Sequence, residues 1–280
     1  MNRTFEHSGP VSVDVQLASG DIRIDRAEGA TIEVDLQAHD PELQELVETA
    51  TVELRGDRLV VDVPGKRSGF GFNIGSLFGS RGITCLIRCS EGSSVRVRSK
   101  SADVVIAIDV ETADISTASG DARLETVNGD LSFKGASGDI VARNVGGRAS
   151  LNTASGDVRV GHVGGDLNAN SASGDIVVQA AHADVRANTA SGDVEIELVT
   201  TGEITVNSAS GDVSIGVRRG SQVYLDCNTV SGDARSELGP VGDQPTSDGP
   251  LVHLKARTVS GDIEITRAGE PAGHTQEVQA

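Results

Sequence analysis

Carboxylates recur at a fixed place in this sequence, each directly after a Ser-Gly pair. Ser-Gly-Asp occurs nine times, and the copies in the central part of the chain are 18 residues apart. Five consecutive copies are Ser119-Gly120-Asp121, Ser137-Gly138-Asp139, Ser155-Gly156-Asp157, Ser173-Gly174-Asp175 and Ser191-Gly192-Asp193. Because carboxylate oxygens are the ligands that Ca²⁺ takes, the candidate metal ligands are Asp121, Asp139, Asp157, Asp175 and Asp193.

The number and spacing of these carboxylates favour a structural role over a calcium site. Ca²⁺ takes six to eight oxygens, whereas each repeat supplies one Asp at this position. Toxin-type repeats that bind calcium place Asp two residues after a third Gly, which is a different pattern. We therefore predict a chain corner at each Ser-Gly-Asp, where the Asp and Ser side chains accept hydrogen bonds from corner N–H groups. These bonds would offset the repulsion of about 0.8 kcal/mol between charges about 5 Å apart in water.

The remaining polar residues show no catalytic pattern. The six His are scattered, and the chain has no His-Glu-x-x-His, Gly-x-Ser-x-Gly or phosphate-binding loop. With 2% aromatic residues and no Trp, the chain has little to line a pocket or to form a carbohydrate-binding platform. The net charge of −17 argues against nucleic acid as a partner. We predict a non-enzymatic protein without a cofactor.

One segment, 66–81, differs from the rest because it contains three of the five Phe between basic residues. Phe70, Phe72 and Phe78 are too bulky to fit together inside a thin coil. Either they pack over one end of the fold, or they contact a protein partner or a membrane surface. A membrane contact would come from this segment alone.

The repeat itself predicts the fold. Each 18-residue unit divides into two nine-residue halves, such as Ser155–Val163 and Gly164–Ala172. Val158 and Val160 alternate with Arg159, which is the pattern of a strand with one buried face. A constant period indicates a coil that climbs one strand spacing per turn. The predicted fold is all-β, a single-stranded β-helix (β-solenoid) with one short N-terminal helix.

Equivalent positions of successive coils should form ladders with a spacing of about 4.8 Å. One predicted inward ladder is Val104, Ala122, Ile140, Val158, Ile176, Val194 and Val213. A second is Ala113, Leu131, Ala149, Leu167, Val185, Ile204 and Leu225. A ladder of stacked amides is Asn152, Asn170, Asn188, Asn207 and Asn228. Alanine precedes each corner from Ala118 to Ala209, which predicts a coil too narrow there for more than a methyl group.

The N-terminal part is expected to continue the solenoid and to cover its end. Ser19-Gly20-Asp21 repeats the corner signature, and Asp40-Pro41-Glu42 is a helix-start sequence that predicts a helix near 41–49. Residues 51–54 and 59–63 should form a hairpin. The predicted organisation is an N-terminal β-rich cap at 1–82, solenoid repeats at 83–265 and a flexible tail at 266–280.

The cysteines and the N-terminus predict the cellular location. Cys85, Cys89 and Cys227 lack Cys-x-x-Cys spacing and are expected to be small apolar fillers in a reducing compartment. The first eleven residues have no apolar stretch of the kind that a signal peptide needs. We expect a cytoplasmic protein with no membrane-spanning segment.

The Ser-Gly-Asp-Val-x-Val coils, together with Ser19–Ile24 and Ile83–Gly92, resemble the bacterial "putative adhesin" β-strand-repeat family. The resemblance covers about residues 10 to 265. It implies a β-helical protein of unknown function, with some members tied to cell-envelope stress, and it provides no catalytic residues.

These observations together predict a non-catalytic structural or protein-interaction scaffold of this adhesin type, linked to the cell envelope, that binds a protein partner or itself. One alternative is a calcium-dependent or carbohydrate-contacting adhesive module. Another is a cytosolic regulatory partner in envelope-stress signalling, which only the family resemblance implies.

Overall fold

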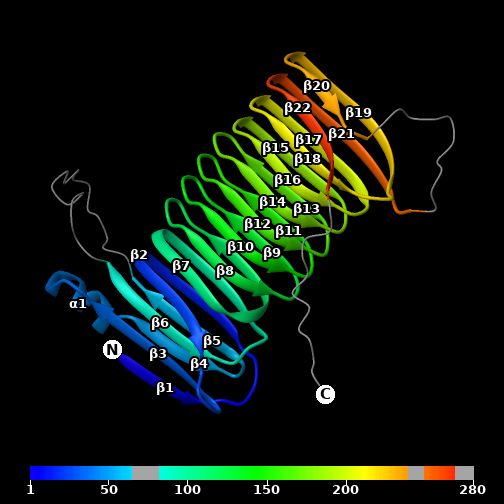
Figure 1. The fold of residues 1–280 in the computed structure, drawn as a ribbon. Coiled ribbons are helices and arrows are strands. Elements are labelled where there is room, and N and C mark those ends of the chain that lie inside the picture. Colours follow the sequence, from blue (N-terminus) through cyan, green and yellow to red (C-terminus); the bar gives the residue numbers. More distant parts are fainter. Residues whose placement is uncertain (65–81, 239–248, 269–280) are drawn as a thin grey trace, which may run out of the picture.

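The computed structural model describes residues 1–64, 82–238 and 249–268, and in it the chain forms a rod of stacked β-coils (Figure 1). The strands follow one another along the rod, and one short helix lies near the N-terminal end. This arrangement confirms the all-β solenoid with one short helix.

Each turn of the solenoid, called a rung below, contributes one strand to each of two faces. The first face contains β8 (Ala122–Val127), β10 (Ile140–Val145), β12 (Val158–Val163), β14 (Ile176–Ala181), β16 (Val194–Val199) and β18 (Val213–Arg218). The second contains β9 (Leu131–Lys134), β11 (Ala149–Asn152), β13 (Leu167–Ser171), β15 (Val185–Ser191) and β17 (Gly202–Ser210). Neighbours are parallel, with Ile140 beside Val158 and Ala149 beside Leu167, which confirms the 18-residue period and its two halves.

The first turns of the rod come from two long strands. β7 (Ser93–Ser116) winds past both faces, because its Val104 lies beside Ala122 of β8 while its Ala113 lies beside Leu131 of β9. β2 (Ser12–Arg26) runs parallel to β7 on the other side. The N-terminal corner Ser19-Gly20-Asp21 thus stacks directly on Ser101-Ala102-Asp103, in which Ala takes the place of Gly.

A cap of antiparallel strands and a helix follows at the N-terminal end. β2 pairs in parallel with β5 (Arg58–Val63) and with β6 (Ile83–Cys89). The outer strands then pair antiparallel: β4 (Thr51–Arg55) with β5, β3 (Thr31–Ala38) with β6, and β1 (Asn2–Glu6) with β3. The helix α1 (Pro41–Glu48) connects β3 to β4, and the Asp40 carbonyl accepts hydrogen bonds from the Leu43 and Gln44 amides. Val47 of α1 is 1% exposed, so the helix contributes to the core. The predicted helix and hairpin are both present.

The order of the last two rungs differs from the order in the sequence. The strands are β19 (Gln222–Ser231), β20 (Ala234–Ser236), β21 (Leu251–Ser260) and β22 (Ile263–Ala268). β21 lies between β17 and β19, and β22 lies between β18 and β20. The predicted contact of Ile204 with Leu225 is therefore wrong, because Leu254 lies between them. The final segment of the chain is inserted as the penultimate rung.

The composition of the two rungs explains this exchange. Ile263 and Ile265 face inward on β22 and are each 1% exposed. The equivalent residues of the last rung, Ala234 and Ser236, are exposed. Apolar area is worth about 25 cal/mol per Å² removed from water, so the rung with two Ile is favoured in the interior position and the rung with Ala and Ser at the end.

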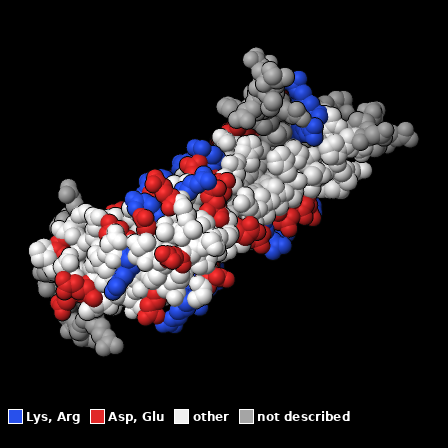
Figure 2. All heavy atoms as spheres, turned by 90° about the horizontal axis from the view of Figure 1, so that it is seen from below, with Lys and Arg blue, Asp and Glu red and all other residues white. Residues whose placement is uncertain are grey.

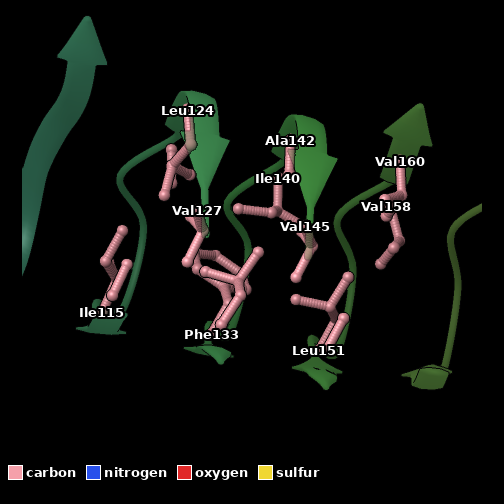
Figure 3. Close-up of a cluster of buried hydrophobic side chains, with 14 of the residues drawn as sticks. Ile115, Leu124, Val127, Phe133, Ile140, Ala142, Val145, Leu151, Val158 and Val160 are labelled. Atoms are coloured by element: carbon pink, nitrogen blue, oxygen red, sulfur yellow. The ribbon is translucent and has the colours of Figure 1, made fainter. Parts of the chain in front are cut away.

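The core runs along the inside of the coil as a column of aliphatic side chains. Figure 3 shows Ile115, Phe133 and Leu151 on one face pointing toward Leu124 and its neighbours on the other. Along one ladder small and large residues alternate, as Ala113, Leu131, Ala149 and Leu167, which lets the two faces interdigitate there.

The alanines that precede the corners are not part of this core. From Ala118 to Ala209 they are exposed, and the same position holds exposed Val259 and Val230 in the last two rungs. The prediction of a narrow interior at these alanines is wrong because their side chains point outward. The residue just before each Ala, such as Thr153, points inward instead.

Several predictions fall partly or wholly outside the described residues. Phe70, Phe72 and Phe78 lie there, and so does 269–280 of the predicted tail. β22 continues to Ala268, three residues beyond the expected solenoid boundary. The division into three regions stays a prediction. No helix in the described part of the chain is long and apolar enough to cross a bilayer.

Candidate functional site

The Asp residues of the corners form a continuous chain of hydrogen bonds along the rod. The Asp139 Oδ1 accepts the backbone N–H of Asp157 at 2.9 Å, and the Asp157 Oδ1 accepts that of Asp175 at 3.0 Å. The same bond joins the rungs from Asp103 to Asp212, then passes to Asp262 and to Asp233. Each carboxylate thus fastens the next corner, and a hydrogen bond to a charged group contributes about 1.5–3 kcal/mol.

The corner glycines lie in backbone contact with one another. A Cβ built on Gly156 would be 2.0 Å from the carbonyl oxygen of Gly138. Gly120, Gly138, Gly156 and Gly174 are buried, and Gly192 is partly buried. Glycine is required at these positions because no side chain fits between the stacked corners.

The hydroxyl that bonds to the corner backbone does not belong to the corner serine, as predicted, but to the residue two positions before it. The corner serines Ser119, Ser137, Ser155, Ser173 and Ser191 are exposed. The Thr153 Oγ1 accepts the N–H of Gly156 at 3.1 Å and donates to the carbonyl of Gly138 at 3.3 Å. Thr117, Ser171, Thr189, Ser208 and Thr258 are buried at the same position. These hydroxyls form a satisfied polar ladder inside the coil, so their burial carries little penalty.

The predicted amide ladder runs along most of the rod and then stops. Asn170 donates to Asn152 at 2.8 Å, Asn188 donates to Asn170 at 2.8 Å and Asn207 donates to Asn188 at 2.9 Å. Because of the inserted rung, Arg257 lies beside Asn207 where Asn228 was predicted. Arg257 Nη2 lies 3.5 Å from the Asp226 carboxylate of the final strand.

The acidic corners interact with cations of the same strand and with backbone. Asp157 Oδ2 accepts a bond from Arg159 at 2.8 Å, and Asp233 is paired with Arg235 at 2.9 Å. Within the described ranges no group of three or more His, Cys, Asp or Glu is arranged to hold a metal ion. Figure 2 shows acidic and basic side chains next to each other along the rod, with a broad uncharged band beside them.

The side of the rod carries open hollows. One of about 230 Å³ is lined by Arg148, Asp166, Asn168, Asp184 and Arg186 among others. Its oppositely charged residues come from neighbouring rungs and lie on the second face of the solenoid. Leu167 and Val185 also line it, but it has no aromatic lining of the kind that small-molecule pockets usually have.

The three thiols are held in their neutral form. Burial raises the pKa of Cys85 to about 12 and that of Cys89 to about 11. Cys227 is half-buried on the final rung, and burial raises the pKa of its thiol to about 11. None of these pKa values favours a nucleophilic thiolate near neutral pH.

Large apolar side chains reach the surface at the C-terminal end of the rod. The large hydrophobic residues that are exposed in the described ranges are Tyr224, Val230, Leu251 and Val259, all on β19 and β21. The Tyr224 ring stacks on His253 with centroids 4.9 Å apart. Sequence reasoning missed this site, since it depends on which rung is last.

Comparison with solved structures finds proteins of similar extent and low sequence identity. A "putative adhesin" from Parabacteroides distasonis is 11% identical, with 94% of this chain and 96% of that chain covered and a TM-score of 0.43. A "putative lipid binding protein" from the same species is 15% identical, with 96% and 95% covered and a TM-score of 0.43. A "putative adhesin" from Bacteroides fragilis is 15% identical, with 95% and 96% covered and a TM-score of 0.34. Comparison with curated proteins finds no match.

Comparison with protein-family models finds one match, which spans residues 11–224. The matched region begins beside β2 of the cap, contains all the rungs with an 18-residue spacing, and ends within β19. It includes the corners up to Ser210, the buried hydroxyls from Thr117 to Ser208 and the amide ladder from Asn152 to Asn207. The chain therefore belongs to the Toastrack family, DUF4097.

Proposed function

We propose that this protein is a non-catalytic, rod-shaped scaffold of the adhesin type that works through protein contacts at the cell envelope. One observation carries the proposal: the polar side chains that repeat along the chain form hydrogen bonds that hold successive rungs together. The corner Asp, the buried hydroxyls and the Asn side chains bond to one another or to backbone from rung to rung. What remains for recognition is the rod surface and its apolar end.

The end of the rod supports contact with a protein more than with a small ligand. Tyr224 and Val230 are 58% and 79% exposed and lie on one strand with a free edge in the described structure. Proteins commonly use such edges for strand addition, in which main-chain bonds supply affinity and side chains supply specificity. The sides of the rod, where the structure describes them, carry mixed charges and no exposed large hydrophobic side chain.

The test is site-specific photocrosslinking in cells of the source organism. A benzophenone amino acid replaces Tyr224 at the end or Arg159 on the side, where both side chains are exposed. We expect discrete protein adducts from position 224 and few from position 159. Adducts at neither position, or turnover of a peptide or glycan substrate by the purified protein, would contradict the proposal.

The calcium-dependent module is the second function to test. Each of the five candidate carboxylates accepts the backbone N–H of the Asp in the next corner, which already explains their spacing. They are the carboxylates of Asp121, Asp139, Asp157, Asp175 and Asp193. Calcium binding would raise the thermal midpoint, because a ligand stabilises the folded state that binds it by RT ln(1 + [L]/Kd). Since the carboxylates already accept backbone N–H groups, we expect the thermal midpoint to be unchanged by millimolar Ca²⁺.

A further inference from the structure

The two ends of the rod are built differently. At the N-terminal end, α1 and the strands β1, β3 and β4 cover the last coil, and Val47 of the helix is 1% exposed. At the C-terminal end, β19 and β20 are the outermost strands (Figure 1). Within the described ranges, the part of β19 from Val223 to Ser231 pairs with β21 on one side and has no strand on the other.

The inward side chains of this last rung are only half-buried. Val223, Leu225 and Cys227 are partly exposed, although they continue ladders whose preceding members are covered. In the preceding rung, Val252 and Leu254 at equivalent positions are 0% and 1% exposed. The column of core residues therefore ends at an open surface instead of at a polar cap.

The end is also nearly neutral in an acidic protein. Residues 222–238 and 249–268, which form the last two rungs, carry five acidic residues (Asp226, Asp233, Glu237, Asp262, Glu264) and four basic ones (Arg235, Lys255, Arg257, Arg267). The whole chain has a net charge of −17. Two copies would repel each other least if they approached through this end.

We propose that the C-terminal end binds a second copy of this chain head to head, with β19 pairing antiparallel to β19 of that copy about a two-fold axis. This inference rests on the proposed scaffold function and names its partner. An unpaired strand edge is a template for another strand, and a two-fold interface requires a self-complementary surface.

The side chains of β19 select one register. Residues opposite each other in an antiparallel pair must point to the same side, so the axis passes through a residue and not between two. An axis at Asp226 would place two carboxylates face to face, which is unfavourable. An axis at Leu225 would leave Val230 unpaired.

An axis at Cys227 satisfies every outward position. Tyr224 then lies opposite Val230 of the second copy, and Asp226 lies opposite its Asn228. The two most exposed apolar residues of the strand cover each other, and the single carboxylate meets an amide. Because a two-fold interface uses the same surface of both copies, the pairing closes at a dimer and does not propagate into a filament.

The main test is sedimentation velocity of the full chain over a concentration series. We expect a dimer of twice 28.8 kDa for the native sequence. Tyr224→Lys combined with Val230→Lys places like charges opposite each other twice and should weaken dimerisation at least tenfold. Tyr224→Lys combined with Val230→Glu restores complementary pairs and should recover the dimer, now with greater sensitivity to salt.

A matched control keeps the readout specific. Ala190→Lys changes the same corner position as Val230 in the middle of the rod, where Ala190 is also exposed, and should leave the dimer intact. Both target side chains are exposed, so the variants should fold, which circular dichroism checks. A monomer at all concentrations, or a dimer that is indifferent to the double-Lys variant, would overturn the proposal.

Oxidation by diamide tests the register independently. Two Cys227 thiols on the axis would each lose a proton and an electron to diamide, which becomes a hydrazine as the disulfide forms. Opposed Cα atoms in an antiparallel pair are about 4.5–5.5 Å apart, within the range of a disulfide. We expect a covalent dimer that Cys227→Ser abolishes, and no covalent dimer would refute this register.

The two proposals fail in distinguishable ways. A photocrosslink from position 224 to a different protein, with a monomer in the centrifuge, would overturn head-to-head pairing and keep the scaffold function. Species larger than a dimer would overturn the two-fold arrangement. An adduct with the mass of two copies supports both.

Discussion

Replacing a single corner carboxylate separates its hydrogen-bonding role from its charge. Asp157→Ala removes the acceptor of the Asp175 N–H at 3.0 Å and the ion pair with Arg159 at 2.8 Å. Asp157→Asn keeps an oxygen in the same place and removes only the charge. We expect the Ala variant to be less stable than the native protein and the Asn variant to be nearly as stable.

The expected magnitudes follow from the geometry. A hydrogen bond to a charged group contributes about 1.5–3 kcal/mol, and a neutral one about 0.5–1.5 kcal/mol. Asp157 is flanked by Asp139 and Asp175 at a spacing of about 4.8 Å, so two like-charge repulsions of about 0.9 kcal/mol each in water disappear in both variants. Salt reduces this relief to about 1 kcal/mol in total. Asp157→Ala should therefore cost about 1–2 kcal/mol, and Asp157→Asn should stay within about 0.5 kcal/mol of the native protein.

Urea denaturation followed by circular dichroism measures these differences. A gap of about 1–2 kcal/mol between the two variants corresponds to a midpoint shift of about 0.3–2 M, given slopes of about 1–3 kcal/mol per M. If Asn were as destabilising as Ala, the negative charge itself would be required and the hydrogen-bond explanation would fail. A rise in the native midpoint with calcium, absent from both variants, would favour the metal site instead.

Three further outcomes are expected. Gly156→Ala should prevent folding or cost more than about 3 kcal/mol in the same urea assay, because its Cβ would lie 2.0 Å from a backbone oxygen of the preceding corner; near-native stability would show that the corners can separate. Val47→Ala should cost about 2 kcal/mol, because this side chain of the cap helix is 1% exposed; no loss would mean that the cap is dispensable. In thiol titration of dilute, monomeric protein at pH 8, Cys227 should react before the chain unfolds because it is only half-buried, and Cys85 and Cys89 only after urea is added because both are fully buried; fast reaction of all three in native protein would argue against this packing.

Most of the corner site could be predicted from the sequence because its spacing is a direct consequence of the coil. A constant 18-residue period places Asp139, Asp157 and Asp175 at the same point of successive turns, and the alternation of Val158 and Val160 with Arg159 assigns the inward face. The identity of the bonding hydroxyl could not be predicted in this way. At a corner the strict alternation of strands ends, so sequence spacing no longer says whether a Ser or the Thr two residues before it points inward.

The sequence by itself therefore determined the β-solenoid, its period and most of its inward ladders, since these depend on contacts between residues one period apart. It also determined the N-terminal helix, because the local sequence Asp40-Pro41-Glu42 marks a helix start. The tertiary structure alone decided which rung is last. The 29-residue interval before the final corner allows the chain to return, and burial of Ile263 and Ile265 favours their rung in the penultimate place. This choice leaves Tyr224 and Val230 exposed at the end of the rod, because the rung of β21 and β22 is covered on both sides and the rung of β19 and β20 on one side.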